Sequence, residues 1–247
     1  MKVALLVTCL VDLMRPPIGF AAIDLLEAAG CEVSVPEAQT CCGQPAYNAG
    51  DRKSAMVLAR KVLEEFEDFD YVVIPSGSCA GMLRTHYADL FAGQVEEARI
   101  AKLCARTFEL TDFLSRVMKG KGIQAQPDLS MTYHDSCSGL RECGIKDQPR
   151  ELLAKVKGVK VKEMEQAESC CGFGGLFSVK YSEIATHIAK RKCEFIAKAG
   201  VDAVVLGDLG GMLHIEGCLR RGGDDKTPVL HVAEVLSGKP KTSVLSA

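Results

Sequence analysis

The sequence contains no tryptophan, and aromatic residues make up only 6% of its 247 residues. Proteins that bind single-stranded nucleic acid stack the bases on aromatic side chains, so this composition argues against such a platform. A basic surplus is also missing, because the formal net charge is −2. The chain therefore lacks the electrostatic footprint of a nucleic-acid-binding protein, and we expect no nucleic-acid partner.

Long apolar runs are missing too. No stretch reaches the roughly 18 apolar residues that a membrane-spanning helix needs. The run VALLVTCLV at 3–11 resembles the start of a signal peptide, but no small-residue cleavage site follows, and Asp12 and Arg15 interrupt the apolar character. A buried parallel strand explains the run better. We expect no membrane span and a cytoplasmic location, where cysteines are more often ligands or nucleophiles than disulfides.

Several common motifs are absent. The sequence has no G-x-x-x-x-G-K-[ST] phosphate loop and no G-x-S-x-G nucleophile elbow. The segment GFGGLF at 172–177 has Phe177 where a dinucleotide fingerprint requires its third glycine. The C-x2-C-x2-C-x3-C-P run of ferredoxin modules is also missing. These absences argue against a dinucleotide site, a serine hydrolase and a ferredoxin module.

Short apolar runs alternate with longer amphipathic stretches. The strand-like runs are 3–9, 32–36, 71–75, 130–134, 159–164 and 201–206, and the clearest helical patterns are 17–29, 51–66 and 182–199. Alternation of strands and helices predicts an α/β fold with parallel sheets covered by helices.

The order of cysteines and strands repeats after roughly 130 residues, which indicates an internal duplication. Cysteines follow predicted strands at Cys9, Cys41-Cys42 and Cys79 in the first half, and at Cys137 and Cys170-Cys171 in the second. We predict two pseudo-symmetric lobes, each with a small parallel sheet covered by helices. The first lobe spans 1–120 and the second, with an incomplete cysteine set, spans 130–247. The boundary falls in 119–129, which is rich in glycine, lysine and proline.

Twelve cysteines are unusually many for a chain of this length. In open parallel sheets the carboxyl ends of the strands form the ligand-binding edge, so Cys9, Cys41, Cys42 and Cys79 should converge there. Four thiolates suit either Zn²⁺ or an iron–sulfur cluster. Structural zinc sites usually take cysteines in pairs two to four residues apart, whereas this pair is adjacent and the other two cysteines are distant. We favour a cubane [4Fe–4S] cluster, with Gly43 allowing a close turn, and keep zinc as the alternative.

The second half begins with the same pattern, Cys137 and Cys170-Cys171-Gly172, but the positions that align with Cys79 are Asp208 and Gly211. Candidates for a fourth ligand are Asp208, His214 and Cys218. A site with three thiolates and an open position, which could hold a second cluster, and an empty, degenerate site both remain open. His134 is either a donor to a cluster sulfur or a core residue. The remaining cysteines, Cys31, Cys104, Cys143 and Cys193, are interpreted as ordinary buried residues.

Four segments carry a resemblance to a known family: TCCGQPAYNAGD at 40–51, PSGSCAGML at 75–83, YHDSCSGLRECGIKDQPRELL at 133–153 and ESCCGFGGLFSVKYSEIA at 168–185. They resemble the cysteine-rich (CCG) domain family, which includes the CCG-bearing component of heterodisulfide reductase and the iron–sulfur subunit of glycolate oxidase. The sequence is most similar to the short, stand-alone lactate-utilisation type (LutA/YkgE).

The resemblance implies an iron–sulfur electron-transfer subunit that works with a LutB-like ferredoxin-type subunit and a LutC-like subunit in oxidising L-lactate to pyruvate. It carries cluster ligands over onto Cys9, Cys41, Cys42 and Cys79, and onto Cys137, Cys170 and Cys171. Two positions depart from the family pattern. Gly211 stands where a cysteine usually precedes an LMHI-like stretch, and Ser138 stands where histidine often follows the HDSC cysteine. Met82 replaces the last cysteine of the C-x-x-C that holds non-cubane clusters in heterodisulfide reductases, which favours a cubane in the first half.

Three functions remain to be compared. The leading one is the electron-transfer subunit of an iron–sulfur oxidoreductase, because the chain has no flavin or nicotinamide fingerprint for hydride chemistry of its own. The second is a subunit that acts on thiol or disulfide substrates at the three-cysteine site, by analogy with heterodisulfide reductases. The third is a zinc-stabilised interaction module without redox activity.

Overall fold

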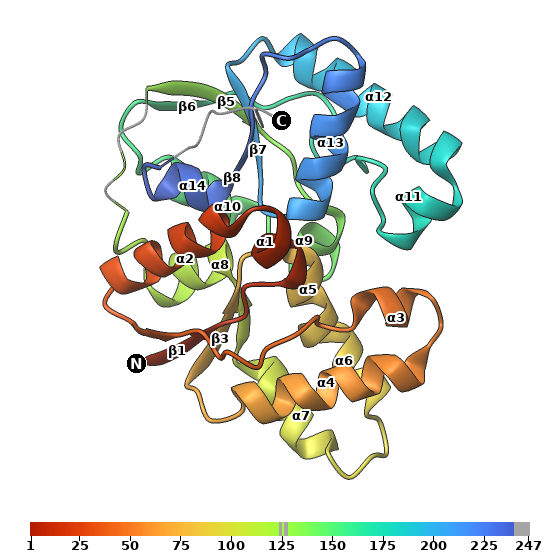
Figure 1. Ribbon diagram of the computed structural model, residues 1–247. Helices are drawn as coiled ribbons and strands as arrows, with labels where there is room; N and C mark the ends of the chain where they lie inside the picture. Colours follow the sequence, from red (N-terminus) through yellow and green to blue (C-terminus); the bar gives the residue numbers. More distant parts are fainter. Residues whose placement is uncertain (124, 126–127, 240–247) are drawn as a thin grey trace.

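Two four-stranded parallel sheets form the framework of the molecule (Figure 1). The structure, a computed structural model, describes residues 1–123, 125 and 128–239. The first sheet contains β1 (Lys2–Leu5), β2 (Glu32–Ser34), β3 (Tyr71–Ile74) and β4 (Thr107–Glu109) in the order β2-β1-β3-β4. The second contains β5 (Leu129–Tyr133), β6 (Val159–Val161), β7 (Ala203–Leu206) and β8 (Val229–His231) in the order β6-β5-β7-β8. The predicted α/β fold with two pseudo-symmetric lobes is confirmed.

Helices cover both sheets. In the first half they are α1 (Cys9–Met14), α2 (Pro16–Ala28), α3 (Gln44–Asn48), α4 (Arg52–Phe66), α5 (Gly77–Gly81), α6 (Tyr87–Leu90), α7 (Glu97–Ala105) and α8 (Leu110–Asp112), with π-helical turns η1 (Met82–His86) and η2 (Phe113–Val117). In the second half they are α9 (Cys137–Arg141), α10 (Asp147–Leu153), α11 (Leu176–Lys180), α12 (Ser182–Ala199), α13 (Leu209–Arg221) and α14 (Val232–Leu236). The helices predicted from the sequence are confirmed as α2, α4 and α12.

The apolar run 3–11 does not form one strand, which corrects the prediction. The strand β1 ends at Leu5, and α1 begins at Cys9, where the hydroxyl of Thr8 accepts a hydrogen bond from the amide of Val11. A side-chain cap of this kind starts a helix, so the run is divided between a strand and a helix. The short outer strands β4 and β8 were not predicted, because three residues give too little alternation to detect.

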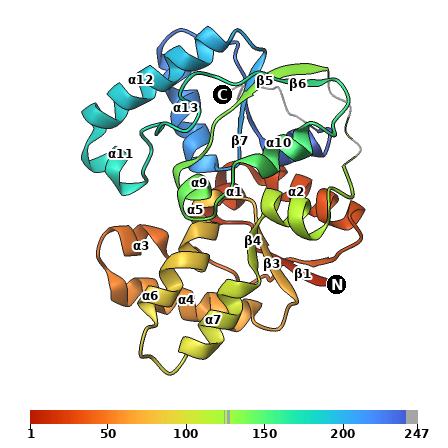
Figure 2. The same ribbon diagram turned by 180° about the vertical axis from the view of Figure 1, so that it is seen from behind.

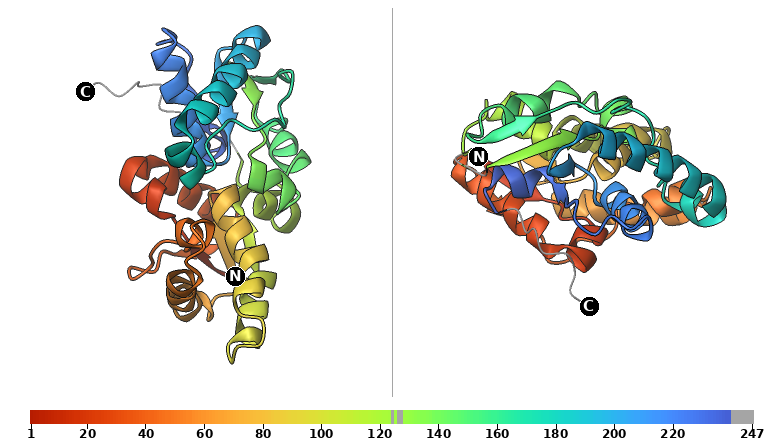
Figure 3. Two further views of the ribbon diagram at one scale, coloured as in Figure 1. Left: turned by 90° about the vertical axis from the view of Figure 1, so that its right-hand side faces the viewer. Right: turned by 90° about the horizontal axis from the view of Figure 1, so that it is seen from above.

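Each half packs part of its core against the other (Figures 1 and 2). The helix α14 of the second half packs on α2 of the first, and α10 packs on α8 and η2. One apolar core therefore contains residues of both halves, such as Leu25 and Phe113 beside Leu152 and Val235. Figure 3 shows the two sheets with their helices stacked along the long dimension of the molecule.

The carboxyl ends of the central strands β3 and β7 meet at a seam between the halves. The amide of Gly77 donates to the carbonyl oxygen of Gly207 at 3.1 Å. The carboxylate of Asp208 accepts hydrogen bonds from the Ser76 hydroxyl at 3.0 Å and the Ser78 amide at 2.9 Å. Both ligand-binding edges of the molecule therefore face the same seam.

The predicted boundary segment 119–129 includes residues 124 and 126–127, and the predicted second lobe includes 240–247; these residues lie outside the described part of the chain. Within the described ranges, no helix is long and apolar enough to cross a membrane.

A buried carboxyl group lies at the end of β4. Glu109 is 2% exposed, and its Oε2 accepts hydrogen bonds from the amides of Thr111 and Asp112 at 2.8 and 3.2 Å. Burial raises the pKa of Glu109 from 4.5 to about 7, because the charged form loses its hydration.

We expect the Glu109→Gln variant to remove a pH-dependent loss of stability. The folded-state pKa lies above the unfolded one, so the stability that this group contributes below pH 4.5 is lost as the pH rises through about 7. The difference in unfolding free energy, variant minus wild type, should therefore grow by about 3 kcal/mol over this interval. Urea unfolding of both proteins across this interval measures it, and a difference independent of pH would contradict the assignment.

Candidate metal centre

The first-half cysteines lie together at the carboxyl edge of the first sheet. Cys9 begins α1, Cys41 and Cys42 precede α3, and Cys79 lies in α5. The sulfur atoms of Cys42 and Cys79 are 3.3 Å apart. The Cys41 sulfur is hydrogen-bonded to the thiols of Cys42 and Cys9. The structure therefore brings together all four cysteines that the sequence predicts as one ligand set.

Cys41 is the cysteine of this group whose thiolate form is most favoured. Its pKa is lowered because the thiols of Cys42 and Cys9 donate to its sulfur, and the amide of Gly43 donates to it at 3.4 Å. The pKa values of Cys9 and Cys42 are raised, first because each donates to Cys41. Gly43 has φ 87°, a conformation that L side chains rarely adopt, and this turn points its amide at the Cys41 sulfur.

The second-half cysteines repeat this arrangement with three members. Cys137 begins α9, and Cys170 and Cys171 precede Gly172. A hydrogen bond from Cys137 lowers the pKa of Cys170 to about 5, and the amide of Gly172 donates to the same sulfur at 3.2 Å. Burial raises the pKa of Cys171 to about 11. Gly172 also has a positive φ, 93°, so both doublets end in the same turn.

Gly211, on α13, takes the place of the fourth cysteine. A Cβ atom at this position would lie 3.7 Å from the sulfur of Cys171, in keeping with the contact between Cys79 and Cys42 in the first half. Of the two alignments offered by the sequence, the structure therefore supports Gly211. The other position, Asp208, caps α13 by accepting from the Gly210 amide at 3.2 Å and also lies in the seam.

The two other candidates for a fourth ligand lie further along α13. The Nε2 atom of His214 would be 3.2 Å from a Cβ at Gly172, and burial lowers its pKa. The thiol of Cys218 is hydrogen-bonded to Cys193. Three other cysteines have partners of their own: Cys31 contacts the sulfur of Met118, Cys104 donates to the carbonyl of Leu83, and Cys143 lies 4.0 Å from the carbonyl of Gly77.

A buried polar pair supports the loop before Cys170. His134 is 1% exposed, and its Nδ1 lies 3.1 Å from the carbonyl oxygen of Ala167. Burial lowers its pKa to about 3. Lys192, also 1% exposed, donates from Nζ to the carbonyl oxygens of Gln166 and Ala167 at 2.6 and 3.3 Å. His134 therefore contacts a backbone carbonyl, as a core residue does.

Sequence reasoning missed Lys192. Its position in the sequence could have indicated its burial. Lys192 lies on the apolar face of 182–199, in helical spacing with Ala185, Ala189 and Ile196. Burial lowers its pKa to about 8, while the nearby groups Cys171, Asp135, Cys137 and Cys170 raise it. The burial of a lysine near thiols is costly unless hydrogen bonds or negative groups compensate its positive charge.

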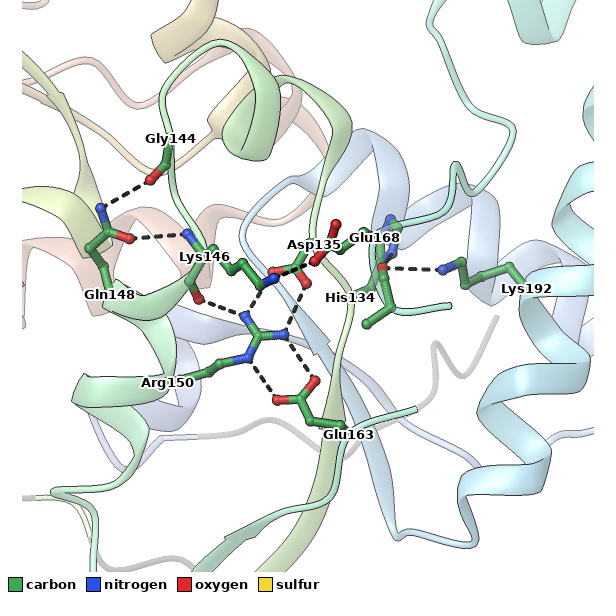
Figure 4. A network of polar contacts seen from close by, with 10 residues as sticks. His134, Asp135, Gly144, Lys146, Gln148, Arg150, Glu163, Glu168 and Lys192 are labelled. Carbon is green, nitrogen blue, oxygen red and sulfur yellow. Dashed lines mark hydrogen bonds and ion pairs between the residues drawn. The ribbon is translucent and has the colours of Figure 1, made fainter. Parts of the chain in front are cut away.

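An ion-pair network fixes the residues on either side of Cys137 (Figure 4). Arg150 donates to both oxygens of the buried Asp135, at 2.8 and 2.9 Å, and to both oxygens of Glu163, at 2.7 and 2.9 Å. Lys146 pairs with Glu168 at 2.5 Å. Because Asp135 precedes Cys137 and Glu168 precedes Cys170, the network connects α10 to both loops that carry the second thiol group.

A cavity of about 220 Å³ opens between the halves at the seam. Cys137, Cys170, Cys171 and Gly211 line it, and Gln44, Ser78 and His86 contribute from the first half. The second thiol group therefore faces this partly open cavity. Cys9 instead lines a separate groove with Asp12 and Gln39.

Among the described residues, no group of three or more His, Cys, Asp or Glu side chains has an arrangement that could hold a metal ion. In each half the thiols instead form a row of neighbouring sulfur atoms. One sulfur in each row, that of Cys41 or Cys170, accepts a hydrogen bond from the backbone amide of Gly43 or Gly172.

Comparison with known proteins identifies the family. The model of the cysteine-rich (CCG) domain matches residues 3–84 and 131–216, once in each half. A protein named lactate utilization protein A from Geobacillus kaustophilus is 45% identical over 97% of this chain and 100% of its own length. Proteins of the same name from Bacillus cytotoxicus and Halalkalibacterium halodurans are 42% and 40% identical over 97% and 98% of this chain, and over 100% and 99% of their own lengths.

A solved structure of a hypothetical protein from Helicobacter pylori aligns with 95% of this chain and 48% of that one, with a TM-score of 0.59 and 11% identity. This likeness concerns the fold alone. The two matches to the domain model and the full-length relatives show that the chain belongs to the cysteine-rich (CCG) domain family.

Proposed function

We propose that this protein is the iron–sulfur electron-transfer subunit of an oxidoreductase system that oxidises L-lactate to pyruvate. The observation that carries the proposal is the repeated group of cysteines at the carboxyl edge of each sheet, with both edges facing one seam. The full-length similarity to proteins named lactate utilization protein A supports the metabolic role. The proposed lobes remain 1–120 and 130–247.

The chemistry of the donor set, four thiols in one half and three in the other, suits an iron–sulfur cluster, which takes its thiolates on separate iron atoms rather than on one ion. Thiolates are the ligands of such clusters, and hydrogen bonds to the sulfur atoms tune their potentials. In the first half, Cys9, Cys41, Cys42 and Cys79 would hold a [4Fe–4S] cluster, with the amide of Gly43 donating to Cys41. In the second half, Cys137, Cys170 and Cys171 would hold another through three thiolates. The bound clusters would supply one-electron transfer.

Lactate oxidation releases two electrons and two protons, so this chain must pass electrons on. Each cluster carries one electron at a time, and the sequence has no nicotinamide or flavin fingerprint. We therefore propose a LutB-like ferredoxin-type subunit and a LutC-like subunit as partners. The twelve cysteines are free thiols, which suits the reducing cytoplasm, and we propose that location.

A second candidate function follows from the cavity. Because Cys137, Cys170 and Cys171 line the cavity at the seam, the second site could act on a thiol or disulfide substrate, by analogy with heterodisulfide reductases. Turnover of disulfides by the isolated chain with a one-electron donor, without lactate, would favour this alternative.

Metal analysis tests the cofactor. Protein purified without oxygen should contain about four iron and four sulfide per chain if one site is filled, and about eight of each if both are. Replacing Cys42 with serine should remove about four iron, because Cys42 contacts both Cys41 and Cys79. Cys31→Ala is the matched control, since Cys31 contacts only Met118 among the described sulfur atoms.

Stoichiometric zinc without sulfide, unchanged by reconstitution with iron, would overturn the electron-transfer proposal and support the zinc-stabilised interaction module.

Reconstitution with partners tests the reaction. The chain mixed with the two proposed subunits should reduce an artificial electron acceptor when L-lactate is added. Cys42→Ser should lower this rate at least about tenfold, a loss of about 1.4 kcal/mol in transition-state stabilisation, whereas Cys31→Ala should retain it. An unchanged rate in Cys42→Ser would show that the first thiol group does not lie on the electron path.

A further inference from the structure

The two halves can be matched residue by residue through their hydrogen bonds. The amide of Leu6 donates to the carbonyl of Val73 at 3.0 Å, and the amide of His134 donates to the carbonyl of Val205 at 2.9 Å. These bonds occupy the same place in the two sheets, just after β1 and β5. The buried, apolar Leu6 of the first half therefore corresponds to the buried, polar His134 of the second.

The glycine after each doublet gives a second match. A Cβ at Gly43 would meet the carbonyl oxygen of Ala55 in α4, and a Cβ at Gly172 would meet the carbonyl oxygen of Ala185 in α12. Both alanines are buried. The helices α4 and α12 therefore approach the two thiol groups in the same register.

Counting along these helices from the paired alanines, Lys192 takes the place of Val62, and both side chains are buried. At these two matched positions the first half has the apolar side chains of Leu6 and Val62. The second half places Lys192 on the carbonyls of the loop before Cys170, close enough to act electrostatically on the three thiols, and Arg141 is hydrogen-bonded to Cys137.

The second half has more cations near its thiols than the first half, but it has fewer thiols. Gly211 replaces Cys79, so the second group has one thiolate fewer, and the space next to Cys171 opens into the cavity. One thiolate fewer, with Lys192 and Arg141 nearby, makes the thiol group of the second half less negative than that of the first. The position that Gly211 leaves open faces the cavity, and the two cations act on it through the thiols and the loop that they contact.

We propose that the cavity at the seam binds a small 2-hydroxy or 2-oxo acid anion directly, at the ligand position that Gly211 leaves open beside Cys171. This inference rests on the proposed lactate-utilisation function and deepens it, because it makes the second half the substrate site and the first half the electron relay. Lys192 acts as a positioning residue, through the loop carbonyls that it holds and through its charge.

The cavity suits a ligand of this size. Its volume of about 220 Å³ is well above the roughly 10–15 Å³ that a single water needs on the same measure, so it accommodates a three-carbon acid. Gln44 and His86 from the first half and Ser138 from the second bring amide, ring and hydroxyl groups to the wall. Such groups can hydrogen-bond to a carboxylate and a neighbouring hydroxyl or keto oxygen.

Two carboxylates also line the cavity, and both have partners. Asp208 accepts hydrogen bonds from Ser76 and from the amides of Ser78 and Gly210. Glu142 accepts from the Ser138 hydroxyl at 3.2 Å and lies 3.5 Å from Nε2 of His86. These donors satisfy Asp208, whereas Oε2 of Glu142 has no hydrogen-bond partner among the described residues, so an anion must bind on the Gly211 side of the cavity, away from Glu142.

Electron paramagnetic resonance of the reduced, anaerobically purified protein tests the proposal. Titration with L-lactate or pyruvate should shift the signal of one cluster, whereas acetate at the same concentration and ionic strength should not. Gly211→Cys should retain iron and sulfide and lose the shift, because a thiol fills the open position. Gly211→Ala is the matched control, since it adds the Cβ without the sulfur and should keep the shift.

The Lys192→Met variant should weaken the binding of L-lactate, measured as Kd from the spectral titration, by about tenfold. The comparison is valid only if the Lys192→Met variant contains as much iron and sulfide as the wild type. If it contains less, the Gly211→Cys and Gly211→Ala variants provide the test.

The outcomes separate this inference from the proposed function. A wild-type protein with clusters whose spectrum ignores L-lactate and pyruvate would overturn substrate binding while leaving electron transfer intact. A shift that persists in Gly211→Cys would place the ligand elsewhere and would also overturn the inference. An equal shift with acetate would show that the 2-oxygen is not recognised. A protein with zinc and no sulfide would overturn the proposed function itself.

Discussion

The contact between the carboxyl ends of β3 and β7 is the constraint on which the rest of the structure depends. Parallel sheets present ligands at their carboxyl edges, so a duplicated α/β unit has two such edges. Here the backbone bond between Gly77 and Gly207 and the Asp208 carboxylate join the two edges. A ligand at one edge is therefore within reach of residues from the other, which a single lobe could not provide.

The halves share their strand order and differ in several buried side chains near the thiols, of which three bear on the site. Leu6, Val62 and Cys79 correspond to His134, Lys192 and Gly211. Burial of a lysine is costly unless partners compensate, and the carbonyls of Gln166 and Ala167 provide that compensation. Divergence after duplication has thus changed the charge and the number of cysteines at one site without altering strand order.

The sequence predicted most of the framework and much of the candidate site. The central strands and the helices α2, α4 and α12 have strong periodicity and clear end signals, such as Asp51 and Gly200. The grouping of Cys9 with the doublet and Cys79 followed from their places after strands. The strands β4 and β8 were too short to show a hydrophobic alternation. The seam could not be predicted because it joins residues that are far apart in the sequence. Lys192 was hidden because an apolar helix face predicts burial and says nothing of compensating carbonyls.

The packing of α14 on α2 has a consequence for how the chain matures. A ribosome delivers the N-terminal half first, so the apolar face of α2, with Ala22, Leu25 and Leu26, is exposed until residues 232–236 have been synthesised. The first lobe completes its core only when the chain is nearly finished. The packing that supports the loops of Cys9, Cys41, Cys42 and Cys79 is therefore complete only in the whole chain.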